Sequence, residues 1–255
     1  MTDAVFRRYV AIGDSFTEGV GDVDPARPNE VRGWADRVAE VLAARDPDFQ
    51  YANLAIRGRQ LRRILDEQLA PAVAMAPDLV SIYAGANDIM RARVELDALV
   101  AAYDEAIAQL AATGARVLMW TAYDPGEAPL IRAMRGRFAT YNELVREVAD
   151  RHGATVVDFW RMREYRDMRM WDTDRIHMSP LGHARMALAV LDVLGVDHDL
   201  VHEVLDPLPE VPRREAREAT IAWVRGFAVP WVGRRLRGRS SGDELLPRRP
   251  TLGRP

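Results

Sequence analysis

The chain of 255 residues is 48% hydrophobic and 29% charged, which is enough for one α/β domain with a dense core and too little for two full domains. It contains no cysteine, and this excludes disulfides, thiolate metal sites and a cysteine nucleophile. Residues 1–206 carry 24 arginines against 33 acidic residues, whereas residues 207–255 carry 11 against 5, so the formal net charge of −3 conceals a basic C-terminal segment.

Short apolar runs alternate with helical patterns along the first part of the chain. Buried strands are predicted at residues 9–12, 50–54, 79–83, 116–120 and 155–158, and amphipathic helices at residues 34–44, 61–69, 94–110, 138–148 and 179–194. This alternation indicates a parallel sheet covered by helices on both faces. In such sheets, ligands bind beyond the carboxyl ends of the strands.

The basic segment, residues 207–255, is predicted to follow a main domain over residues 1–206. Its residues 213–238 place apolar side chains at helical spacing among arginines, at Ile221, Val224, Ala228 and Trp231, and the end of the chain is predicted to be extended. A basic amphipathic helix fits an anionic membrane surface or a partner protein. We expect this helix instead to pack on the main domain, because a net charge of +6 then faces −9.

Four polar blocks carry the residue types of a catalytic site. They are residues 13–15, 53–58, 85–88 and 174–177. The first three follow the first three predicted strands, and the fourth lies in the loop after the fifth. Because the carboxyl ends of parallel strands meet at one edge of a sheet, all four blocks are expected to converge there.

The first and last blocks offer a nucleophile and a base. Ser15 lies where the first strand turns into a helix, although a serine there is also a common helix cap. A serine hydroxyl needs a base to remove its proton, and a histidine base needs a carboxylate to fix its tautomer. Asp174 and His177 provide this pair at a three-residue spacing, although a lone pair of this kind is usually an exposed loop feature.

The second and third blocks offer hydrogen-bond donors for an oxyanion. Gly58 has no side chain, so its N–H can approach a substrate oxygen, and the amide of Asn87 can donate another bond. Taken alone, Gly58 is better explained as an ordinary turn glycine and Asn87 as a turn-forming asparagine.

In this order, the blocks resemble those of the GDSL lipase/esterase group in the SGNH-hydrolase superfamily, over roughly residues 9–195. The resemblance implies an α/β, three-layer, flavodoxin-like fold with five parallel strands in the order 2-1-3-4-5 and no cofactor. It also implies site roles: Ser15 as nucleophile and first oxyanion donor, Gly58 and Asn87 as the other donors, and His177 as base with Asp174 as its partner.

Two positions depart from the usual pattern of this group. Phe16 follows the nucleophile where the group name has leucine, and the large Arg57 stands where a small residue is common. Four further residues, Asp14, Arg57, Asp88 and His183, are expected to support the site or to line the substrate pocket. For His183, a surface or half-buried position is preferred over a role in bracing the loop.

The sequence therefore predicts a serine ester hydrolase that acts on small-molecule acyl esters through an acyl-enzyme on Ser15. An acyltransferase or a thioesterase of the same fold is the alternative, and a metallophosphoesterase or a non-catalytic binding module is less favoured. No metal, cofactor or nucleic-acid partner is expected. Because neither a signal segment nor a membrane span is recognisable in the sequence, a cytoplasmic location is predicted.

Overall fold

A six-stranded sheet lies at the centre of the structure, a computed structural model that describes residues 5–91, 93–126, 131–201, 203–207, 212–230, 233 and 241–255. Its strands are β1 (Arg8–Gly13), β2 (Gln50–Asn53), β3 (Leu79–Tyr83), β4 (Arg116–Trp120), β5 (Thr155–Val157) and β6 (Arg249–Gly253). They are arranged in the order β5-β4-β3-β1-β2-β6. The predicted parallel order 2-1-3-4-5 is confirmed. The prediction of only five strands is wrong, because β6 pairs antiparallel with β2 at the edge of the sheet.

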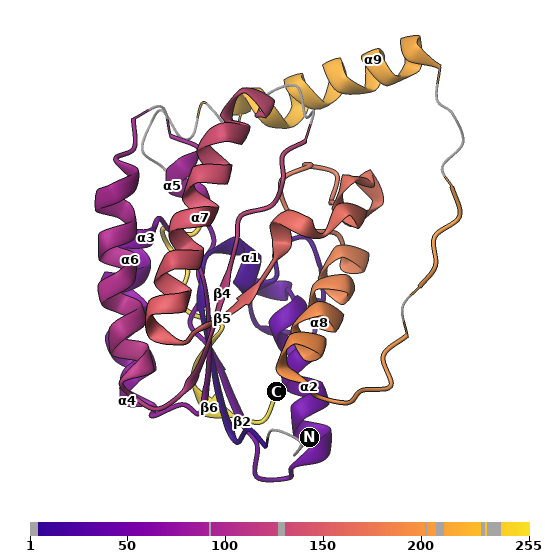
Figure 1. Ribbon diagram of the computed structural model, residues 1–255. Helices are drawn as coiled ribbons and strands as arrows, with labels where there is room; N and C mark the ends of the chain where they lie inside the picture. The colour runs from indigo at the N-terminus through magenta and orange to yellow at the C-terminus, as the bar shows by residue number, and fades with distance from the viewer. Residues whose placement is uncertain are drawn as a thin grey trace.

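Helices cover both faces of this sheet, as predicted (Figure 1). The helices are α1 (Ser15–Glu18), α2 (Trp34–Arg45), α3 (Leu61–Ile64), α4 (Ala70–Ala74), α5 (Ala86–Ile89), α6 (Leu96–Ala111), α7 (Arg135–His152), α8 (Pro180–Leu194) and α9 (Arg213–Trp223). A π-helical turn, Leu65–Leu69, joins α3 to α4. The pair α2 and α8 packs on one face of the sheet, and α3, α6 and α7 pack on the other.

The side-chain alternation of β1 divides the core into these two layers. Tyr9 and Ala11 point into the layer with α2 and α8, whereas Val10 and Ile12 point into the layer with α3, α6 and α7. All four are fully buried, as a strand covered on both faces requires. A continuous apolar run therefore encodes this central strand.

Strand register brings the ends of β1, β2 and β3 to one edge. Gly13 at the end of β1 is level with Tyr83 at the end of β3, and Ala11 is level with Asn53 at the end of β2. The polar blocks that follow these strands consequently begin at the same edge of the sheet.

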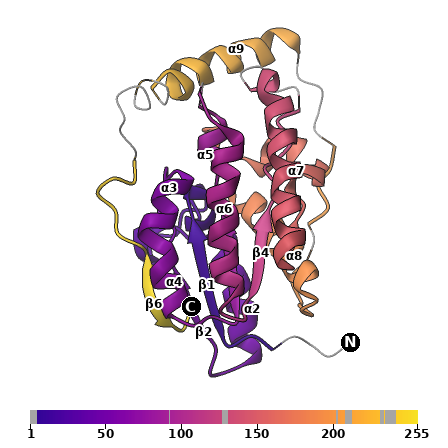
Figure 2. The same ribbon diagram turned by 60° about the vertical axis from the view of Figure 1, so that its left-hand side comes forward.

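The C-terminal segment crosses this edge and then returns to the sheet. Figure 2 shows α9 passing over the ends of α5 and α7, before the chain descends to β6. A π-helical turn, Val224–Ala228, continues α9, whereas Trp231, Val232 and residues 234–238 of the predicted helix lie outside the described residues. Among the helices of the described residues, none combines the length and apolar character needed to cross a membrane.

A buried ion pair anchors β6 beside the main domain. Arg248 pairs with Asp36 of α2, and both side chains are fully buried. The same guanidinium donates to the backbone carbonyls of Glu18 and Arg32, each at 2.7 Å. The residue before β6 is thus fixed to α1, α2 and the loop between them.

We expect Arg248→Ala to lower the free energy of unfolding by about 3–5 kcal/mol, because it leaves the buried carboxylate of Asp36 without its main partner. Urea denaturation measures this change. The control is Arg62→Ala, which removes an arginine that is 82% exposed and pairs with Asp66 on the surface, and which should cost about 1 kcal/mol or less. Equal effects of the two variants would contradict the docking of the segment before β6.

Candidate active site

The turn that carries Ser15 is held by backbone contacts that only glycine permits. A Cβ atom on Gly13 would lie 2.6 Å from the carbonyl oxygen of Tyr83 and 2.7 Å from Oγ1 of Thr17. The buried amide of Gln68 accepts from Gly13 N–H at 2.8 Å and donates to Gly13 C=O at 3.0 Å. Ser15 then begins α1, so its N–H has no partner within the helix.

Asn87 links the nucleophile turn to the second polar block. Its Nδ2 donates to Oδ2 of Asp14 at 2.8 Å and to the carbonyl oxygen of Arg59 at 3.1 Å. Asp14 in turn caps α1, because its Oδ1 accepts from Phe16 N–H at 3.1 Å. Asn87 is therefore bound to the residue before Ser15, and both of its amide hydrogens already have acceptors.

Gly58 lies in an exposed turn, and the residue before it, Arg57, is held by hydrogen bonds to Glu18. The carboxylate of Glu18 accepts from Arg57 N–H at 2.6 Å and from its guanidinium at 2.7 Å, and Glu18 itself is fully buried. Gly58 has a φ of +75°, which favours glycine. In the hydrogen bonds formed among the described residues, Gly58 N–H is not a donor, so it is available to a substrate.

The Asp174–His177 pair forms as a short hydrogen bond. Oδ2 of Asp174 lies 2.6 Å from Nδ1 of His177, and its Oδ1 accepts from the backbone N–H groups of Ile176 and His177, each at 2.9 Å. Burial acts to raise the pKa of the Asp174 carboxyl, but the hydrogen bond and charge of His177 outweigh it and hold this pKa below its usual value. Asp174 is therefore ionised and fixes the imidazole.

Two observations show that the Asp174–His177 pair lies close to the turn that carries Ser15. A Cβ atom on Gly21, just after α1, would lie 3.3 Å from the Cβ of His177. The charge of His177 also acts on the carboxyl of Asp14, the neighbour of Ser15. Among the described residues, Ser15 Oγ forms no hydrogen bond with His177. Catalytic hydrogen bonds often tighten only when substrate binds.

The sequence matches the GDSL-like Lipase/Acylhydrolase family over residues 11–185. The chain belongs to this family. Membership makes the protein a carboxylic ester hydrolase. The predicted relationship to the GDSL group is thereby confirmed.

Solved structures with the same fold include two hydrolases. LAE5, an alpha/beta hydrolase enzyme from the metagenome of Lake Arreo in Spain, is 27% identical with a TM-score of 0.61, and the match covers 74% of this chain and 95% of that chain. Axe2, an acetylxylan esterase from Geobacillus stearothermophilus, is 24% identical with a TM-score of 0.62, over 77% of this chain and 98% of that chain. No curated protein sequence matches this chain.

Phe16, the departure from the GDSL name, anchors α1 in an aromatic cluster. Its ring stacks on that of Tyr83 at 4.0 Å between centroids and lies 5.6 to 6.2 Å from the rings of Phe159, Trp34 and Trp120. Aromatic contacts of this kind add to the free energy of burial. The phenyl ring thus holds the helix that begins with the predicted nucleophile.

Asp88 and His183 support the site from a distance. Oδ2 of Asp88 accepts from Leu61 N–H at 2.9 Å, so this carboxylate caps α3. His183 is fully buried: its Nδ1 accepts from Trp34 N–H, and its Nε2 lies 3.1 Å from the carbonyl oxygen of Val20. Burial lowers the pKa of His183 to about 4, so the ring is neutral. The prediction of a surface or half-buried position for His183 is wrong, because its ring joins α8 to α2 and the loop after α1.

Sequence reasoning missed Gln68 and Glu18. Both are buried polar residues that hold backbone atoms of the first two blocks. Gln68 falls among the apolar residues of the predicted helix 61–69. A side-chain amide in such a position indicates a buried hydrogen-bonding role, and this was the signal that the sequence offered.

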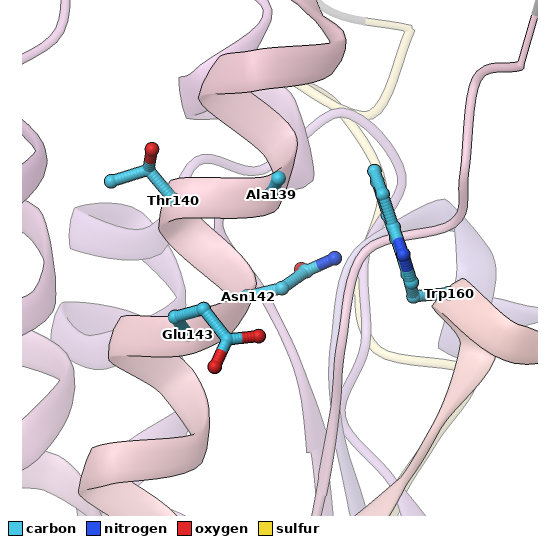
Figure 3. A pocket seen from close by; sticks show the side chains of 5 residues that line it. All are labelled: Ala139, Thr140, Asn142, Glu143 and Trp160. Carbon is cyan, nitrogen blue, oxygen red and sulfur yellow. The ribbon is translucent and has the colours of Figure 1, made fainter.

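Two cavities lie apart from these residues. One, of about 260 Å³, is lined by Ala139, Thr140, Asn142, Glu143 and Trp160, between α7 and the turn after β5 (Figure 3). The amide of Asn142 is already bound to the backbone of Ala122. The other, of about 540 Å³, is lined by Glu164, Arg166, Asp167, Arg169, Met170, Arg185 and residues 204–207. Neither is lined by a predicted catalytic residue. No three His, Asp or Glu side chains of the described residues are grouped as metal ligands.

Asp14 gives the site a measurable pH dependence. Burial raises its pKa to about 7, although the hydrogen bond from Phe16 N–H and the charge of His177 act in the opposite direction. The folded protein thus binds this proton more tightly than the unfolded chain does. The resulting contribution to stability is fully present below about pH 4 and is lost as the pH rises through about 7.

We expect Asp14→Asn to become more stable relative to wild type as the pH rises from 4.5 to 8.5, by about 3 kcal/mol, because asparagine has no proton to lose. Urea denaturation at several pH values measures the difference. The control, Asp48→Asn, changes an exposed aspartate and should show a nearly constant difference. A constant difference for Asp14→Asn as well would contradict the raised pKa.

Proposed function

We propose that the protein hydrolyses carboxylic esters through an acyl-enzyme on Ser15, with His177 as general base and Asp174 as its orienting carboxylate. The observation that carries this proposal is the 2.6 Å hydrogen bond between Asp174 and His177, in a loop that packs against the segment after α1. Ser15 begins α1 at the carboxyl end of β1. A serine, a histidine and an ionised aspartate at one sheet edge are what nucleophilic acyl transfer requires.

Acylation begins when Nε2 of His177, the ring nitrogen that Asp174 does not hold, takes the proton of Ser15. The Oγ–carbon bond forms as the carbonyl oxygen becomes an oxyanion. When the intermediate collapses, the bond to the alkoxy group breaks, and His177 returns its proton to the departing alcohol. Water then attacks the acyl-enzyme with the same proton transfers and releases the carboxylic acid.

Two backbone N–H groups are proposed as the principal oxyanion donors. These are Ser15 N–H, at the start of α1, and Gly58 N–H, which is free of protein acceptors among the described residues. A donor of this kind typically stabilises the transition state by about 3–4 kcal/mol. Asn87 holds Asp14 and the Gly58 turn together, so it reaches the oxyanion only by giving up one of its present acceptors.

The residue types agree with those changed in catalytic mutants of Axe2, which replace a serine, an aspartate and a histidine. That enzyme is an acetylxylan esterase. For this chain, we propose small-molecule carboxylic esters as the substrate class. Acyl transfer to an alcohol or amine and thioester hydrolysis proceed through the same acyl-enzyme, so both are outcomes that the following experiment distinguishes.

The test combines labelling with turnover. A fluorophosphonate probe should add one phosphonyl group to the protein, and peptide mass spectrometry should locate it on Ser15. A series of p-nitrophenyl esters from acetate to palmitate, with and without an alcohol acceptor or a chelator, then reports chain-length preference and acyl transfer. A label on another serine, or turnover abolished by the chelator, would refute the proposed mechanism.

Three further expectations stay predictions. They are the division of the chain at residue 206, the independence from cofactors and the cytoplasmic location. Packing of the basic segment on the main domain rather than on a membrane, and the absence of a nucleic-acid partner, stay predictions as well.

A further inference from the structure

The C-terminal helix α9 lies across the catalytic edge of the sheet (Figures 1 and 2). It begins well beyond residue 185, where the match to the family ends, so the family does not assign it a role. Ile221 of α9 and Phe227 of the π-helical turn that continues it are 41% and 42% exposed. These two side chains are not buried against the main domain, whereas Trp223 at the end of α9 is half-buried.

Trp223 makes two contacts with the turn that carries the Asp174–His177 pair. Its Nε1 donates to the backbone carbonyl of Asp174 at 2.8 Å. The guanidinium carbon of Arg175 lies 5.2 Å from the centroid of its ring, within cation–π distance. The indole is half-buried, so both contacts are partly shielded from water. One side chain thus holds two successive residues of the turn.

This turn needs such support, because its backbone is strained. Arg175 has a φ of +56°, in the left-handed region that non-glycine residues adopt at a cost. Contacts within the turn hold its two ends: Arg175 N–H donates to the carbonyl of Asp172, and Asp172 N–H donates to the carbonyl of His177, each at 2.8 Å. The carbonyl of Asp174, between these points, is held by Trp223 of a distant helix.

The peptide group after Asp174 is coupled to the carboxylate of the same residue. That carboxylate accepts from two backbone N–H groups and lies 2.6 Å from Nδ1 of His177. The Asp174 carbonyl shares a peptide group with Arg175 N–H, so its rotation changes the backbone at Arg175 and displaces the N–H groups of Ile176 and His177, which aim the carboxylate at the imidazole. Trp223 is therefore in a position to fix the geometry of the pair through the backbone of the turn.

We propose that Trp223 is a positioning residue for the Asp174–His177 pair, so that α9 completes the catalytic site of the main domain. This inference rests on the proposed function for its effect on turnover, but not for its effect on the geometry of the pair. It makes the segment after the family match necessary for full activity.

The first test compares steady-state kinetics of three variants on p-nitrophenyl acetate and p-nitrophenyl octanoate. Trp223→Ala removes both contacts and should lower kcat about tenfold on both esters, with KM unchanged. Trp223→Phe keeps a ring over Arg175 but loses the N–H donor, so it should lower kcat about threefold. Ile221→Ala, a truncation on another face of α9, is the matched control and should change neither constant.

The second test observes the pair directly. In protein labelled with ¹⁵N-histidine, the proton in the short Asp174–His177 hydrogen bond should give a low-field signal, assigned by its loss in His177→Ala. Trp223→Ala should broaden or shift this signal, and Ile221→Ala should leave it unchanged. If Trp223→Ala lowers thermal stability, Trp223→Phe provides the same comparison in a folded protein.

The outcomes separate this inference from the proposed function. If kcat and the low-field signal are both unchanged in Trp223→Ala, the positioning role is wrong. If KM rises more for octanoate than for acetate while kcat is unchanged, Trp223 contacts the acyl chain instead, and the positioning role is again wrong. If Ser15→Ala retains turnover, the proposed function fails, and the histidine signal alone still decides the role of Trp223.

Discussion

Ser15→Ala is expected to lower kcat/KM on p-nitrophenyl acetate by about 10⁴-fold or more, because no other group can then form the acyl-enzyme. The hydroxyl is not needed for packing: Ser15 is only half-buried, and Asp14, not Ser15, caps α1. The variant should therefore fold like wild type. Residual turnover would come from the oxyanion donors and substrate binding alone.

Thr140→Ala provides a matched control for removal of a hydroxyl. Thr140 lies on α7 beside the cavity of about 260 Å³, and its hydroxyl donates to the carbonyl of Gly136 within the same helix. Its activity should equal that of wild type. If Thr140→Ala lost activity and Ser15→Ala kept it, the catalytic centre would belong to that cavity and the assignment of Ser15 would be wrong.

Asp174→Asn is expected to lower kcat by about 10³- to 10⁴-fold while the fold is retained. The asparagine Oδ1 can still accept from the N–H groups of Ile176 and His177, so the turn keeps its backbone bonds. Its NH₂ group, however, faces Nδ1 of His177 as a donor. The imidazole must then carry its proton on Nε2, where it cannot take the proton of Ser15.

The control for this variant lies in the same loop. The Asp172 carboxylate accepts from Thr173 N–H and forms no hydrogen bond with the imidazole among the described residues, so Asp172→Asn should retain most of the activity. Kinetics of both variants should be accompanied by circular dichroism, which reports the fold. Loss of activity in Asp172→Asn equal to that in Asp174→Asn would mean that the loop, rather than the tautomer of His177, limits turnover.

The parts of the fold that follow from local pattern could be predicted. The strands 79–83 and 116–120 have the predicted bounds, because an apolar run between turn residues encodes a strand buried on both faces. The strand β6 could not be predicted in this way. Its sequence, Arg-Pro-Thr-Leu-Gly, has no strand pattern, and it is extended because the free edge of β2 and the buried pair of Arg248 with Asp36 hold it there.

The candidate site shows the same division between local and tertiary information. The spacing of Asp174 and His177 allowed their pairing to be predicted, since the hydrogen bond lies within one turn. The roles of Gln68 and Trp223 depend on partners 55 and 49 residues away in the chain. Such partners lie far outside the short stretch of sequence from which a helix, strand or turn is predicted. His183 was misjudged for a related reason, because its burial depends on α2 and the loop after α1.

The antiparallel pairing of β6 with β2 also affects how the chain is made. Tyr51 and Asn53 pair with Gly253 and Arg249, which the ribosome synthesises long after β2. A nascent chain that has already assembled its parallel strands therefore presents the bare edge of β2, and unpaired edges of this kind promote association with other chains. Premature termination within the last few codons would leave that edge permanently open. Such truncated products should aggregate even though every residue of the catalytic edge has been translated.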